Sequence, residues 1–119
     1  MMKEKIHTWF NHIEKDAIVP KGIIALHFGI YETEKGYCVY LVGAREYDEY
    51  DDSWAEEVEN VPREFFLEIE TPCEWQDFQK QIAHILADEL KQRKTNPLSP
   101  FHNKIITTGF DDGNLTRIM

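Results

Sequence analysis

The chain has 119 residues, of which 42% are hydrophobic and 13% aromatic, and its formal net charge is −9. This length and apolar content predict a single domain over residues 1–119 and exclude an intrinsically disordered chain. The longest apolar runs have the length of a strand, which excludes a membrane-spanning helix of ~20 residues.

The first half of the chain predicts a helix followed by a β-hairpin. An amphipathic helix is expected over residues 3–15, with apolar side chains at helical spacing. Its stripe consists of Ile6, Trp9, Phe10 and Ile13. From residue 24 to residue 31 the period changes to two, which predicts a strand with one packed face. Residues 33–36 predict a tight loop with Gly36 at a positive φ, and residues 37–43 a central return strand, apolar on both faces.

A strongly acidic segment follows the hairpin. Residues 46–59 carry eight carboxylates, no Lys or Arg, and three aromatic side chains. Residues 46–77 hold 13 acids and one base, a net −12, whereas the rest of the chain has a net charge of +3. A field of this kind repels nucleic acid and anionic membranes and attracts basic partners. We therefore expect neither a nucleic-acid partner nor a membrane partner.

The segment after the acidic residues predicts a third strand and a second helix. Pro62 is expected to close the acidic loop, and residues 65–70 alternate as a strand with a mostly polar outer face. Residues 71–74, Thr-Pro-Cys-Glu, predict a helix start with a reciprocal capping box. Trp75 opens an apolar stripe that continues through about Lys94.

The last part of the chain predicts a fourth strand over residues 104–110 and a tight turn over residues 111–114. Residues 115–119 are expected to pair back as a short fifth strand. The element order is therefore α-β-β-β-α-β(-β). This order predicts an α+β fold, in which two helices pack on one face of an antiparallel sheet of four to five strands.

Two features predict a cytoplasmic protein. The N-terminal residues lack the apolar core of a secretory signal. Cys38 and Cys73 belong to no C-x-x-C pair, and they are expected to be reduced thiols rather than a disulfide or zinc ligands.

No motif predicts catalysis or a resident metal, and we expect no catalytic residue, no metal ligand and no cofactor. Ser53 and Ser99 lie in no G-x-S-x-G elbow, and the five histidines lack metal-binding spacing. An EF-hand frame that starts at Asp48 places Ser53 where the sharp turn requires glycine. Glu68 and Glu70 are expected to be solvated on the outer face of their strand. A carboxylate-rich protein or enzyme that binds divalent metal ions stays open as an alternative.

Aromatic side chains interleaved with acids favour a protein-binding surface, because aromatic anchors ringed by charge are typical of contact patches. An alternative for Trp54 is that it anchors the loop to the core. The expected partner-binding residues are Asp48, Glu49, Tyr50, Asp51, Asp52 and Trp54, with Asp111 and Asp112 as second choices.

Residues 36–55, which include Asp51-Asp-Ser-Trp-Ala55, and residues 108–115, which include Gly109-Phe-Asp-Asp-Gly113, carry a resemblance to a known class. They resemble small bacterial immunity proteins encoded beside polymorphic or contact-dependent toxins. The resemblance implies a non-enzymatic inhibitor that binds a cognate toxin domain inside its own cell. Such toxins are commonly nucleases with a basic groove, which an acidic surface would complement. An adaptor subunit unrelated to toxins is a further alternative.

Overall fold

The computed structural model describes residues 2–16, 22–48, 59–111, 113 and 115–118, and only the backbone of residues 59–65. The elements in chain order are α1 (Met2–Asp16), β1 (Ala25–Glu32), β2 (Gly36–Ala44), β3 (Glu59–Glu70), α2 (Trp75–Arg93), β4 (Ile105–Phe110) and β5 (Thr116–Arg117). This order and the α+β class confirm the prediction. Neither α1 nor α2 combines the length and the apolar character that crossing a membrane requires.

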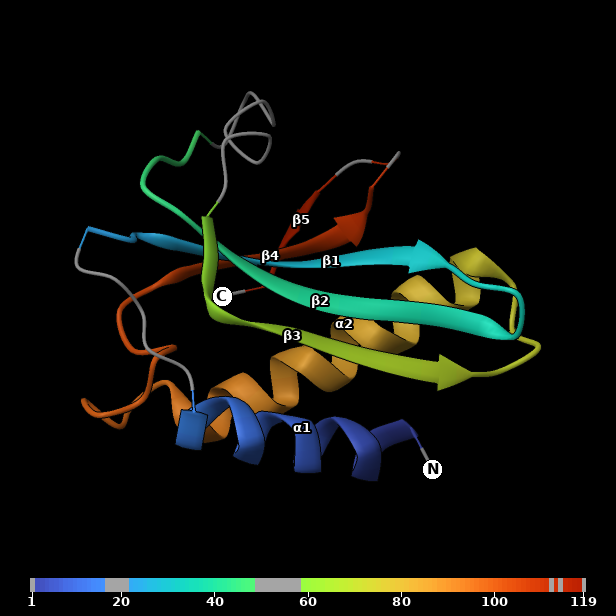
Figure 1. Cartoon of the computed structure of the whole chain (residues 1–119), viewed down its shortest axis with the longest axis horizontal. Coiled ribbons are helices and arrows are strands. Elements are labelled where there is room, and N and C mark those ends of the chain that lie inside the picture. Colours follow the sequence, from blue (N-terminus) through green and yellow to red (C-terminus); the bar gives the residue numbers. More distant parts are fainter. Residues whose placement is uncertain (1, 17–21, 49–58, 112, 114, 119) are drawn as a thin grey trace.

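The five strands form one sheet in the order β3-β2-β1-β4-β5 (Figure 1). Neighbouring strands are antiparallel except for β1 and β4, which run parallel from the pair Ala25–Ile105 to the pair Ile30–Phe110. The sheet is therefore mixed, whereas the sequence predicted an antiparallel sheet. The cause is α2, which crosses from the end of β3 back to the start of β4, and a helical crossover joins strands that run the same way.

Both helices cover the same face of the sheet, as predicted (Figure 1). All four residues of the predicted α1 stripe are buried. Phe10 of α1 lies at the centre of the core, with its ring centroid 5.5 Å from that of Phe28 on β1 and 5.1 Å from that of Phe101. Burial of these apolar side chains is the main force that holds the helices on the sheet.

Gly36 does not have the positive φ that its place in the hairpin predicted. It is the first residue of β2, and among the described residues only Gly22 and Asn103 have a positive φ, of 99° and 56°. A Cβ on Gly36 would overlap the backbone carbonyl oxygen of Ile69 on β3. The position therefore requires glycine because another backbone approaches it closely.

The second helix starts later than its capping signal predicted. It begins at Trp75, and its N-cap residue, Glu74, makes no side-chain capping hydrogen bond. The backbone N–H of Cys73 donates to the hydroxyl oxygen of Thr71 over 3.3 Å. This local bond stabilises a turn before the helix, so the predicted capping box is wrong. Trp75, expected in the buried stripe, is 51% exposed.

Strand β3 begins at Glu59, three residues before the proline that was expected to close the acidic loop. Its pairing with β2 shifts between the pairs Leu41–Phe65 and Val42–Asn60, so residues 61–64 have no partner on β2. Pro62 lies within this bulge and has no N–H to donate to a ladder. The proline is therefore tolerated inside the strand.

Arg93, at the end of α2, ties the two helices together through a largely buried polar cluster. Its guanidinium donates to Glu14 Oε2 over 2.8 Å, to Asn11 Oδ1 over 2.8 Å and to Glu89 Oε2 over 3.1 Å. The hydroxyl of Ser99 donates to the other oxygen of Glu14 over 3.0 Å. The cluster therefore joins α1, α2 and the segment that follows α2.

We expect Arg93→Met to lower the free energy of unfolding by about 3 kcal/mol, because the buried Glu89 carboxylate loses its main cationic partner. Urea unfolding measures the change. Lys91→Met is the matched control, because Lys91 is an exposed base in the same helical turn and should change stability by less than ~0.5 kcal/mol. Equal losses in the two variants would contradict a stabilising role for the cluster.

Candidate functional site

The sheet face that points away from the helices carries a patch that we call the outer face, made of Tyr31, Tyr40, Phe66, Glu68 and Asp111. These side chains alternate along the strands with the buried residues of the core, which places them on the opposite side. Tyr31 and Glu68 flank Cys38 in one row across three strands, and Tyr40 pairs with Phe66 in the next row. The outer face lies toward the carboxyl ends of β1 and β4.

Tyr40 connects β2 with the turn that follows β4. Its hydroxyl donates to Asp111 Oδ1. To reach this carboxylate the ring crosses β1 above Gly29, where a Cβ would overlap the ring and its hydroxyl. Gly29 is thus needed because its missing side chain leaves the space in which the phenol lies.

The aromatic rings of the outer face follow one another across three strands. The ring centroid of Tyr40 lies 6.1 Å from that of Tyr31 and 6.4 Å from that of Phe66. Phe66 is 50% exposed and Tyr31 is 40% exposed. Exposed aromatic side chains that adjoin one another mark a surface suited to contact with a partner.

The phenols of this face stay neutral at neutral pH. Burial raises the pKa of Tyr40 above its ordinary value, and the hydrogen bond to Asp111 raises it further. The pKa of Tyr31 is raised chiefly by its hydrogen bond with Cys38. Both hydroxyls therefore act as uncharged hydrogen-bond donors, and the negative charge of the face comes from its carboxylates.

Several acidic side chains at this end of the sheet are exposed to solvent. Glu32, Glu68 and Glu70 are exposed and form no ion pair within the part of the chain that the structure describes. Aromatic rings beside such carboxylates suit guanidinium and ammonium groups, which stack on the rings and pair with the acids.

The amino end of the same sheet face is covered. His27 Nδ1 lies 2.9 Å from the hydroxyl oxygen of Thr107, and both side chains are buried. Next to them, Tyr47 packs against Ala25 and Ala44. Covered apolar residues at one end and exposed aromatic residues at the other place the accessible surface around Tyr31, Tyr40 and Phe66.

The structure places two of the predicted contact residues, Asp48 and Asp111, at opposite ends of β1. Asp48 follows Tyr47 beside Ala25, whereas the backbone N–H of Asp111 donates to the carbonyl oxygen of Ile30 over 3.0 Å. The structure therefore does not bring these two carboxylates together. The other predicted contact residues lie outside the described residues: Glu49, Tyr50, Asp51, Asp52, Trp54 and Asp112.

Tyr31, Tyr40 and Phe66 were missed as site residues by the sequence interpretation. Phe66 carried a signal, since it is an apolar side chain on the predicted polar side of its strand, between Glu64 and Glu68. Tyr31 lies on the unpacked face of the predicted first strand, so the alternation placed its side chain away from the core but did not mark it as a site residue.

Neither a family model, nor a curated protein, nor a solved structure matches the chain. The residues of the outer face therefore carry the functional argument. Among residues 2–16, 22–48 and the described part of 59–118, no three His, Cys, Asp or Glu side chains are grouped to hold a metal ion. Residues 49–58 of the acidic segment lie outside the described residues, so this statement does not cover them.

We expect Gly29→Ala to destabilise the fold by about 1–3 kcal/mol, because the new methyl group displaces the Tyr40 ring from its place above β1. Urea unfolding of a double-mutant cycle with Tyr40→Ala measures this coupling. In the Tyr40→Ala background the same glycine substitution should cost much less. Equal costs in both backgrounds would show that the ring does not occupy this space.

Proposed function

We propose that the protein is a non-enzymatic inhibitor of the immunity class, which binds a cognate bacterial toxin domain and covers a basic surface on it. The observation that carries the proposal is the outer face, where exposed Tyr31 and Phe66 adjoin the carboxylates of Glu68 and Asp111. Aromatic anchors surrounded by charge are typical of surfaces that bind other proteins.

The rigidity of the outer face supports a binding role. Its aromatic residues project from β1 and β2, two of the three inner strands of the sheet, and from the edge strand β3 that adjoins them. Tyr40 is held between Gly29 and Asp111, so its position does not have to be ordered when a partner arrives. A contact surface that is already ordered loses less conformational entropy on binding, which favours affinity.

The charge distribution supports a basic partner. Residues 46–77 combine 13 acids with one base, and they include Glu68, which lies on the outer face itself. Such a field accelerates the approach of a positively charged surface, for example the substrate groove of a nuclease. Asp48 follows Tyr47, which packs on Ala25 at the amino end of β1, and Ala25 is six residue steps or roughly 20 Å from Tyr31 at the rise of a strand. A surface of that span fits a contact area of about 800 Å² per partner.

The proposal is tested by co-expressing the chain with the product of the adjacent upstream gene. We expect a stoichiometric complex and relief of the toxicity of that product. Phe66→Ala should weaken the complex by about 2 kcal/mol, or ~30-fold in Kd, if the ring is a central anchor. Leu98→Ala is the matched control, because Leu98 is 92% exposed in the segment after α2 and away from the outer face. If no complex forms and growth is not rescued, the proposal fails.

Charge reversal tests the electrostatic part of the proposal. We expect the pair Asp51→Lys and Asp52→Lys, and separately Glu68→Lys, to slow association by about tenfold at low salt and to reduce its dependence on ionic strength. Stopped-flow measurement of the association rate against salt concentration detects both effects. Glu4→Lys on α1 makes the same change of charge as Glu68→Lys but lies on the helical side of the sheet, so it serves as the control. Identical rates for Glu4→Lys and Glu68→Lys would contradict steering by the outer face.

A further inference from the structure

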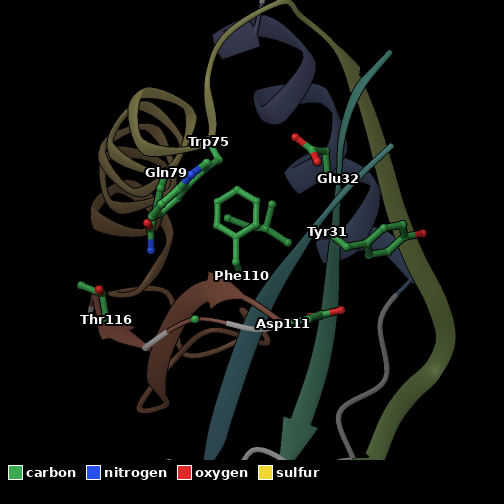
Figure 2. A pocket seen from close by; sticks show the side chains of 9 residues that line it. Tyr31, Glu32, Trp75, Gln79, Phe110, Asp111 and Thr116 are labelled. Carbon is green, nitrogen blue, oxygen red and sulfur yellow. The ribbon is translucent and has the colours of Figure 1, made fainter. Parts of the chain in front are cut away.

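A hollow of about 760 Å³ lies beside the outer face, at the carboxyl ends of the parallel strands β1 and β4 (Figure 2). It exists because β1 continues for two residues past its last pair with β4, Ile30–Phe110. Trp75 and Gln79 of α2 form one wall, and Tyr31, Glu32 and Asp111 lie on the other side. The ring of Phe110 stands between the two walls.

The aromatic side chains of the hollow, Trp75 and Phe110, are fixed by packing against neighbouring rings, and Trp75 is also exposed to solvent. The rings of Trp75 and Phe110 pack edge to face, with centroids 5.9 Å apart and an angle of 81° between their planes. Phe110 is in turn fixed by Tyr37, whose ring centroid lies 5.7 Å away. Trp75 is half exposed although it is a large apolar side chain, which leaves an indole surface available to a ligand.

The charged groups around the hollow favour a cation. Among the nine described residues that line it, Glu32 and Asp111 are carboxylates and none is Lys or Arg. The start of α2 contributes about half a positive charge through the helix dipole. The carboxylates of Glu74 and Asp77 in this part of the chain more than offset it. The hollow is therefore negative on balance.

We propose that this hollow is a socket for an arginine side chain of the partner protein, an inference that rests on the proposed function. The planar guanidinium stacks on the indole of Trp75 and pairs with the carboxylate of Glu32. Asp111, whose Oδ1 accepts from Tyr40, adds negative charge at the edge of the hollow. A volume of about 760 Å³ suits a side chain with its flanking residues and exceeds what a bare ion needs.

Arginine is favoured over lysine by the shape of the hollow. An ammonium group is a compact and strongly hydrated charge, whereas a guanidinium group is flat, less hydrated and able to stack while it donates in its own plane. The socket offers a ring for stacking and the carboxylate of Glu32 for pairing, with Asp111 as a second negative charge at its edge. Both features match a planar donor.

The probe for this proposal is N-acetyl-arginine amide, titrated into the 15N-labelled protein. We expect progressive shifts of the Trp75 indole N–H and the Gln79 side-chain amide, with the indole signal assigned from Trp75→Phe. N-acetyl-citrulline amide, which has the same shape without the charge, should bind at least about tenfold more weakly. Glu32→Gln should weaken arginine binding by a similar factor, and an unchanged Trp9 indole signal would show that the fold is intact. Equal shifts with the citrulline probe, or arginine shifts confined to residues outside the hollow, would overturn the proposal.

Failure of the socket is distinguishable from failure of the proposed function. If Trp75→Ala and Glu32→Gln leave the complex with the upstream gene product unchanged while Phe66→Ala weakens it, the socket is wrong and the inhibitor proposal stands. If all three variants weaken the complex and Leu98→Ala does not, both are supported. If the free protein binds the arginine probe in the hollow but no complex forms, the socket is supported as a cation site and the inhibitor proposal fails.

Discussion

The relative position of the two helices depends on Arg93 of α2, which is only 9% exposed. Its guanidinium donates to Glu14 and Asn11 of α1, and Glu14 in turn accepts from Ser99 in the segment that follows α2. Hydrophobic burial is not directional, so the apolar stripe of α1 could be buried at several positions along the sheet. Charged hydrogen bonds to Glu14 and Asn11 are directional, so they select one position of α1 against α2. Both helices are thereby held on the same side of the sheet, and the other side is left available to the outer face.

The outer face in turn depends on the absence of a side chain at one position of β1. Gly29 lets the Tyr40 ring lie flat across the strand and reach Asp111, which is far from it in sequence. A larger residue would turn this ring outward and separate the aromatic row from the carboxylate. Exposed aromatic surface does not stabilise a folded chain, since each Å² that stays in water forgoes about 25 cal/mol of burial. The exposure of Tyr31, Phe66 and Trp75 therefore has no explanation in stability, which is the physical ground for the proposal that they bind a partner.

Local patterns in the sequence predicted most of the fold, whereas contacts between distant segments were missed. The α1 stripe, the hairpin and the order of the elements follow from periodicity and turn residues, which act over a few positions. The parallel pairing of β1 with β4 was missed although α2, as a helical crossover, implies it. The bond of Arg93 to Glu14 joins residues 79 positions apart, so no local pattern indicated it. Acidity in the sequence predicted a contact surface, which stays a prediction, but the aromatic rings of the outer face come from three strands and meet only in the folded chain.

Asp111 belongs both to the outer face and to the lining of the hollow, so in the proposed complex it contributes to both surfaces. Its Oδ1 accepts from a phenol whose raised pKa keeps it protonated, so the carboxylate is oriented before a partner arrives. The bond fixes the carboxylate at the edge of the hollow, where its charge adds to that of Glu32. On the proposed function, the charge of residues 46–59 affects chiefly the rate of encounter, whereas an oriented carboxylate beside an aromatic ring affects chiefly the rate of dissociation. The proposal thus assigns the class of partner to the acidic segment, and the choice among basic proteins to the fixed residues at the end of β1 and β4.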